Sequence, residues 1–401
     1  MSLQHLKFET ISECDLCRLV DDGIGESKTL EYKEALVVAT EDQKREFLSD
    51  VTALANTDGG DLVFGMKESD GVALELVGLK NFTPDDAIGR IENLLRDSIH
   101  PRLVGVQLRA LQLSNGNHAL LIRIPRSFNA PHMVSHKGVT RFCGRNSNGK
   151  YDLDVQELRS AFLANESLSD RLKSFRIDRI NKIIAGETAV QMSSASLLVF
   201  HLFPAIGLRS DTQIATQKLE QLINDPRFPK PLTTSGSKPS FNFDGLLVSC
   251  GSSSPNCSIS YLQLYRNGFI EAVDSNILSA SIQPNTSQSG QICCSWLEQN
   301  VIDGLSGYLA TFDTLSIPPP YIASVSLLNV KGFILQDNSL YRPHGAIPVD
   351  RDHLLTNEIL IESTSDDAGR LLRPLFDQIW NACGWHGSIN YDKEGNWKHH
   401  R

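Results

Sequence analysis

The stretch QKREFLSDVTALANTDGGDLVFG, residues 43–65, sets the architecture of the first half of the chain. Its first part has helical periodicity, with three apolar residues that would line one face: Phe47, Val51 and Leu54. Residues 58–60, Asp-Gly-Gly, are turn formers, and the apolar run 62–64 is typical of a buried strand. The stretch therefore predicts a helix over residues 43–56, then a turn and a strand.

Strand and helix signals continue beyond this stretch at close spacing. In order, they are a helix from Thr83-Pro84, a hairpin of residues 103–113 and 118–124 around an Asn-Gly turn, a strand over 139–143 and a helix over 154–162. Thr83 can cap its helix, and Pro84 suits the first turn. Together these signals predict an α+β domain over residues 1–165.

The rest of the chain differs in composition. Residues 166–190 predict a connecting helix, and residues 191–401 a second α+β domain whose role the sequence does not assign. Its signals are an apolar stretch at 195–203, strands near 246–249, 260–265, 321–330 and 359–362, a helix near 367–382, and loops rich in Ser, Pro and Gly at 233–240, 251–258 and 287–290.

Composition excludes several classes of protein. The 401 residues include 38 Lys and Arg against 47 Asp and Glu, a net charge of -9, which argues against a protein that coats nucleic acid over its whole surface. No apolar run is long enough to span a membrane, and the first ten residues are too polar for a signal peptide. We therefore expect a cytoplasmic protein that does not bind membranes.

A possible catalytic group lies just before the first helix. If residues 30–33 are extended, Glu31 and Lys33 share one face while Leu30 and Tyr32 point to the core. A carboxylate that holds Mg²⁺ or Mn²⁺ beside a cation that stabilises charge on phosphate is the arrangement a metal-dependent nuclease needs. Glu26 and Glu68 are candidates for the second and third metal ligands, although a strand-edge ion pair without function gives the same pattern.

Charge is unevenly distributed in the first half. Residues 98–151 contain no Asp or Glu, and their eight basic residues are Arg102, Arg109, Arg123, Arg126, Lys137, Arg141, Arg145 and Lys150. Such a segment can follow a phosphate backbone. The alternative is that these residues pair with the acid-rich segment 26–97. For phosphate contact we choose Arg141 and Arg145 first, then Arg123, Arg126 and Lys137.

These motifs together resemble a known family. The residues that carry the resemblance are Glu26-Ser27, Leu30-Glu31-Tyr32-Lys33, the block Ala-Leu-Ala-Asn-Thr-Asp-Gly-Gly-Asp-Leu-Val-Phe-Gly at 53–65, Pro131, and Arg141-Phe142-Cys143-Gly144-Arg145. They are similar to the Schlafen AlbA-type domain, over about residues 20–165. The resemblance implies an α+β nucleic-acid-binding module and the architecture of a single-lobe bacterial member.

The resemblance also implies residue roles. The family's catalytic acids fall on Glu26, Glu31 and Glu68, which would bind Mg²⁺ or Mn²⁺, and its lysine falls on Lys33. Vertebrate members grip transfer RNA between two lobes. Since this chain shows one lobe, the resemblance implies a homodimer.

We therefore expect a metal-dependent endoribonuclease acting on structured RNA, in particular tRNA, in a setting such as anti-phage defence. The alternative is a non-catalytic regulator or sensor that binds nucleic acid through the basic strands. A third hypothesis is that the second domain carries the activity and that the first domain only recruits the substrate.

Overall fold

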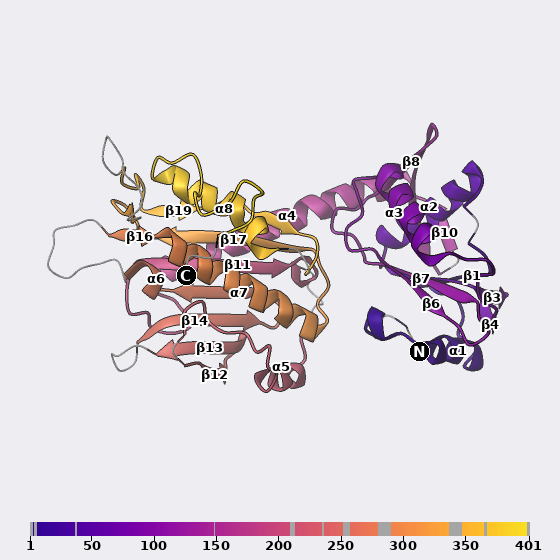
Figure 1. Ribbon diagram of the computed structural model, residues 1–401, viewed down its shortest axis with the longest axis horizontal. Helices are drawn as coiled ribbons and strands as arrows, with labels where there is room; N and C mark the ends of the chain where they lie inside the picture. Colours follow the sequence, from indigo (N-terminus) through magenta and orange to yellow (C-terminus); the bar gives the residue numbers. More distant parts are fainter. Residues whose placement is uncertain are drawn as a thin grey trace. The chain divides into compact units, whose positions relative to one another are not determined.

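The computed structural model describes residues 3, 6–36, 38–147, 149–208, 213–234, 236–251, 257–279, 290–336, 347–364 and 367–398 (Figure 1). The chain divides into two compact units, Met1–Asp170 and Arg171–Arg401. Both units mix helices and strands, so the predicted α+β class is confirmed.

The first unit is built on two four-stranded sheets, with strand orders β1-β2-β7-β6 and β10-β9-β8-β5, and a β3-β4 hairpin. Its helical elements are η2 (Phe8–Thr10), α1 (Glu13–Asp21), α2 (Glu41–Ala55) and α3 (Pro84–Ser98). Its strands are β1 (Leu30–Lys33), β2 (Gly60–Phe64), β3 (Met66–Ser69), β4 (Val72–Leu76), β5 (Ile99–His100), β6 (Gln107–Gln112), β7 (His118–Ile124), β8 (Met133–His136), β9 (Val139–Asn146) and β10 (Gly149–Asp152).

The β1-β2-β7-β6 sheet has an apolar layer on each face. One layer combines α2 and α3 with the strands, through Phe47, Val51, Leu54, Leu62 and Ile91. The other packs α1 and the N-terminal segment against the strands, through Leu16, Leu19, Tyr32, Val63 and Leu121. Burial on both faces explains why residues 62–64 form a continuous apolar run.

Most of the local predictions for this unit are confirmed. The helix over 43–56 is α2, which begins two residues earlier because Thr40 and Gln43 form a capping box. Residues 107–112 and 118–124 form the expected antiparallel hairpin. The helix at Pro84 is present and Thr83 is its N-cap residue, but the Thr83 side chain makes no capping hydrogen bond.

Asn56, directly after α2, connects this helix to the second sheet. Its Nδ2 donates to the carbonyl oxygens of His132 and Cys143, both at 2.9 Å, and its Oδ1 accepts from the His132 backbone N at 2.6 Å. The turn that follows requires glycine: Gly59 has φ +72°, and a Cβ there would lie 2.5 Å from the Arg126 backbone N.

The second unit is built on one antiparallel sheet of order β12-β13-β14-β15-β11-β17-β19, with β20 also paired to β17. Its strands are β11 (Leu197–Pro204), β12 (Lys238–Phe241), β13 (Gly245–Gly251), β14 (Ser258–Tyr265), β15 (Ile270–Asp274), β17 (Tyr321–Leu328), β19 (His353–Leu355) and β20 (Ile359–Ile361), and β16 (Gln291–Cys293) pairs with β18 (Ile334–Gln336). Its helical elements are η3 (Ala205–Leu208), α5 (Thr216–Ile223), α6 (Asn276–Ser279), α7 (Cys294–Leu315) and α8 (Ala368–Ala382).

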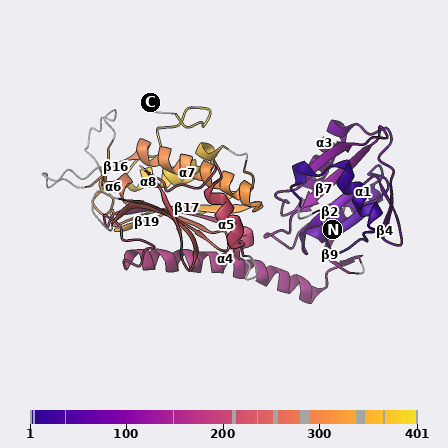
Figure 2. The ribbon, with the colours of Figure 1, turned by 90° about the horizontal axis from the view of Figure 1, so that it is seen from below.

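Helix α4 (Val155–Ile184) is one continuous helix, whereas two separate helices were predicted over this range, and it contains the residue at which the units divide. Its C-terminal part covers one face of the large sheet, while α7 and α8 cover the other (Figure 2). The expected loop at 233–240 is partly wrong, since residues 238–241 are strand β12. Residues 252–256 and 287–289 of the other two expected loops lie outside the described residues.

Glu271 and Glu298 are two of the carboxylates that are buried in this unit. Glu271 accepts hydrogen bonds or ion pairs from three side chains on the α4 side of the sheet: Arg179, His201 and Tyr261. Glu298 on α7 accepts from four neutral donors: Trp380, Ser388, Asn390 and Trp397. Buried carboxylates need such partners, because an unpaired charge is costly away from water.

Candidate functional site

A cavity of about 360 Å³ opens in the first unit, lined by residues from β1, α2, the β3–β4 turn and the β9–β10 region. Eight of its lining residues carry charged groups: Glu26, Glu31, Glu46, Asp50 and Asp70 are acidic, and Lys33, Arg145 and Lys150 are basic. A concave site that combines groups of both signs is a candidate site for chemistry on a charged substrate.

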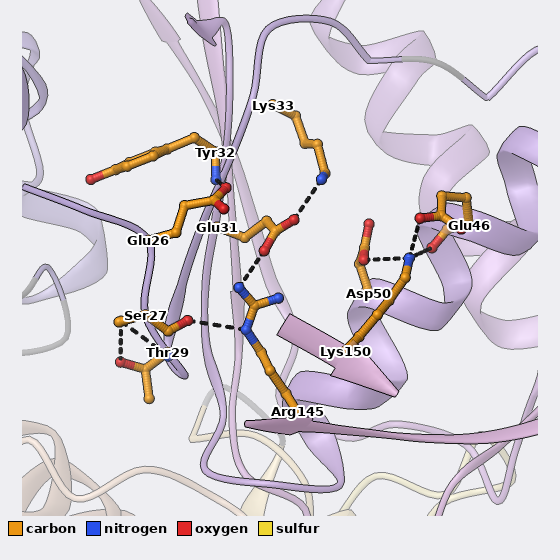
Figure 3. Close-up of polar contacts among 10 residues, drawn as sticks. All are labelled: Glu26, Ser27, Thr29, Glu31, Tyr32, Lys33, Glu46, Asp50, Arg145 and Lys150. Atoms are coloured by element: carbon orange, nitrogen blue, oxygen red, sulfur yellow. Dashed lines mark hydrogen bonds and ion pairs between the residues drawn. The ribbon is translucent and has the colours of Figure 1, made fainter. Parts of the chain in front are cut away.

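Glu31 lies at the centre of this group, between two cations (Figure 3). Its Oε1 accepts from Lys33 Nζ at 2.5 Å, and its Oε2 pairs with the Arg145 guanidinium. The residue is only 7% exposed. Burial alone would raise the pKa of the Glu31 carboxyl, but Lys33 and Arg145 outweigh it and lower that pKa. The predicted alternation along β1 is confirmed, because Glu31 and Lys33 touch while Leu30 and Tyr32 are in the core.

Arg145 is fixed from several sides. Its Nε donates to the Ser27 carbonyl oxygen at 3.0 Å, and its backbone N donates to Thr57 Oγ1 at 3.0 Å. The side chain is 4% exposed. Its guanidinium is therefore held against Glu31 by the chain on both sides of the cavity.

Glu26 borders the cavity from the segment before β1. Its Oε1 accepts from the Tyr32 backbone N at 2.9 Å, and within the described residues its Oε2 accepts no hydrogen bond. Partial burial, and to a smaller extent the neighbouring Glu31, raises the pKa of the Glu26 carboxyl. Glu26 and Glu31 are thus two neighbouring carboxylates in unlike environments.

Sequence reasoning missed Asp50, which enters the cavity from α2. The residue is 4% exposed, and its Oδ1 accepts from Lys150 Nζ at 2.7 Å, while the same ammonium group also pairs with Glu46. Burial raises the pKa of Asp50 although Lys150 opposes it. A signal was present in the sequence, because Asp50 interrupts the otherwise apolar side of the helix between Phe47 and Leu54.

Glu68, the third predicted ligand, lies beside the cavity and is not part of its lining. It is exposed, and its Oε2 accepts from the Gly71 backbone N at 2.6 Å. Mg²⁺ and Mn²⁺ need several convergent oxygen ligands. Across the described ranges, no group of three or more His, Cys, Asp or Glu side chains is arranged to hold a metal ion. As they stand, Glu26, Glu31 and Glu68 therefore do not fit a divalent cation.

Four of the eight basic residues in 98–151 pair with acids from segment 26–97, as the alternative interpretation of this segment states. The pairs are Arg123 with Asp61 at 2.8 Å, Arg126 with Asp58 at 3.2 Å, Arg145 with Glu31, and Lys150 with Asp50 and Glu46. Arg123 is mostly covered, whereas the Arg126 side chain is 46% exposed. Much of the positive charge in this segment is thus already compensated inside the domain.

The remaining basic residues differ in exposure. Arg109 donates to the carbonyl oxygens of Phe8 and Ile11. Lys137 and Arg141, on the β8–β9 hairpin, are exposed and make no ion pair with a described carboxylate, and the same holds for Arg102. Arg141 and Arg145 are four residues apart on β9, so they share a face roughly 13 Å apart along the strand.

Comparison with known proteins identifies one family. The model of the family described as Schlafen, AlbA_2 matches residues 26–154. No curated protein matches the chain.

None of the described helices is long and apolar enough to cross a membrane.

Two solved structures are similar over about a third of the chain. The N-terminal domain of a RecG-related protein from Nitrosomonas europaea is 20% identical, with 34% of this chain and 88% of that chain covered and a TM-score of 0.27. The DIP2311 protein from Corynebacterium diphtheriae is 14% identical, with 35% and 29% covered and a TM-score of 0.26. Similarity at these TM-scores carries no functional information.

Proposed function

Because residues 26–154 form a Schlafen AlbA_2 domain, we propose that the chain is an endoribonuclease that cuts structured RNA in the charged cavity of this domain. The family indicates a nucleic-acid-related role in general. The more specific proposal is supported by one observation: Glu26 and Glu31 lie in the same cavity as Lys33 and Arg145. Transfer RNA is the substrate that the family resemblance implies.

Each group has a role that follows from its position. Lys33 and Arg145 place positive charge where a phosphodiester in the cavity would develop negative charge during cleavage. Glu31 holds both cations in place. The Oε2 atom of Glu26 is available to a hydroxyl group of the substrate, and the 2′-hydroxyl is the group that distinguishes RNA from DNA.

The test compares Glu26→Gln with the wild type on a transfer RNA pool. Glutamine can still accept from the Tyr32 backbone N, so the variant should fold normally and lose at least about 100-fold in cleavage rate, as is typical when a general acid or base is removed. The control is Glu75→Gln, the same chemical change at an exposed position on β4 outside the cavity. Equal cleavage by wild type and Glu26→Gln would reject the assignment.

A second candidate function is nucleic-acid binding without cleavage. Lys137 and Arg141 favour it, because both are exposed cations on the β8–β9 hairpin with no carboxylate partner among the described residues. In that case Arg141→Glu should weaken nucleic-acid binding and make the affinity less dependent on salt concentration, while Glu26→Gln leaves nucleic-acid binding intact. Binding that neither variant changes would exclude this surface.

We further propose that two copies of the chain act together, since a single domain provides one lobe. Mass photometry of the full-length protein with and without transfer RNA tests this. A protein that stays monomeric while it cleaves RNA contradicts the proposal.

A further inference from the structure

We infer that the cavity cleaves RNA without a divalent cation, because Lys33 and Arg145 already occupy the carboxylate that a metal would need and bring their own charge to the phosphate. The inference rests on the proposed endoribonuclease function and makes it more specific. It departs from the metal dependence that the sequence predicts.

Glu31 is the most enclosed of the predicted ligands. Both of its carboxylate oxygens are engaged, Oε1 by the Lys33 ammonium and Oε2 by the Arg145 guanidinium. A metal ion that bound there would have to compete with these two cations for the same carboxylate. Displacing Arg145 would leave a 4% exposed guanidinium without its counter-charge, which is strongly unfavourable.

The other two predicted ligands each have one carboxylate oxygen engaged by a backbone N–H. Glu26 uses one oxygen to accept from the Tyr32 backbone N, and Glu68 uses one to accept from the Gly71 backbone N outside the cavity lining. Neither arrangement supplies the convergent set of oxygens that a hard cation requires. The other carboxylate deep in the cavity, Asp50, is paired with Lys150.

The cavity has the groups that a reaction without a metal ion needs. The 2′-oxygen of the substrate attacks the adjacent phosphorus while its proton passes to the Glu26 carboxylate and from there to solvent. The P–O5′ bond breaks, and the departing 5′-oxygen takes a proton from water. Lys33 and Arg145 stabilise the negative charge on the phosphorane. The products are a 2′,3′-cyclic phosphate and a 5′-hydroxyl, so atoms, charge and electrons balance.

The experiment measures cleavage of a structured RNA by the full-length protein in excess EDTA and in Mn²⁺. We expect rates within about threefold of each other, a 2′,3′-cyclic phosphate end, and complete protection by a single 2′-deoxy substitution at the cut site. Cleavage that occurs only with Mn²⁺, or that tolerates the 2′-deoxy substitution, would overturn the inference and leave the nuclease function standing. The absence of cleavage under both conditions would reject the nuclease function itself.

A second measurement does not depend on activity. Binding of Mn²⁺ to the full-length protein is followed by the electron paramagnetic resonance signal of the free ion. We expect no stoichiometric binding to the wild type, because the described carboxylates of the cavity do not converge on one point. Stoichiometric binding to the wild type that is lost in Glu26→Gln and kept in Glu75→Gln would overturn the inference.

Discussion

Replacing Arg145 by methionine removes the charge that holds Glu31 while keeping a side chain of similar length. Glu31 is 7% exposed and keeps only Lys33 as a partner, and the Ser27 carbonyl oxygen loses its donor. Breaking a buried ion pair from one side costs about 3–5 kcal/mol. Because Lys33 remains, we expect the lower end, about 3 kcal/mol, which corresponds to roughly 150-fold faster local opening.

Hydrogen exchange measured on the full-length protein reports this opening in β1 and β9 without requiring the two units to unfold together. The control is Arg141→Met, the same change on the same strand at an exposed position, where we expect less than about 0.5 kcal/mol. Adding Glu31→Gln to Arg145→Met should restore much of the protection, since a neutral amide does not need a cation. If Arg145→Met exchanges as slowly as Arg141→Met, the ion pair does not stabilise the cavity and the reasoning is refuted.

Three other outcomes are expected. Gly59→Ala should destabilise the first unit by at least about 2 kcal/mol, because φ there is +72° and the new Cβ would meet backbone; unchanged exchange in β2 would contradict this. Glu298→Gln should lower the stability of the second unit by about 2–4 kcal/mol, since either amide orientation turns an NH₂ group toward two donors; the melting temperature and the exchange of residues 388–398 measure it. Burial would raise the pKa of Glu271, but His201 and Arg179 lower it from 4.5 to about 2, so its stabilising contribution is present above pH 4.5 and lost as the pH falls toward 2. Glu271→Gln should flatten that part of the pH profile of unfolding, and an unchanged profile would count against the assignment.

The elements that could be predicted from sequence are those specified by local signals. The α2–turn–β2 unit has helical periodicity, a turn that only glycine fits, and a continuous apolar run, and each acts within a few residues. The short strands β5, β8 and β10 were not predicted. β8 and β10 form by pairing with β9, and β5 forms by pairing with β8. Strands of two to four residues have almost no periodicity of their own in the sequence.

The candidate site was predictable where spacing along one strand determines contact. Alternation along β1 brings Glu31 and Lys33 together, and the structure confirms that contact. Spacing could not show that Arg145 reaches Glu31, more than 100 residues earlier, or that Asp50 enters the same cavity from a helix. For the same reason, the absence of acids from residues 98–151 predicted an open cationic surface, although half of those cations have partners in segment 26–97.

The three hydrogen bonds of the Asn56 side chain have a consequence for biosynthesis. When Asn56 is synthesised, Cys143 is still 87 residues from being made, so the amide remains hydrated until the β8–β9 hairpin emerges. These hydrogen bonds between the early helix and the late hairpin can form only after both segments have been made. Nascent chains halted between these two points have α2 and its apolar partners on β2 and β7, but they lack the partners of the Asn56 side chain.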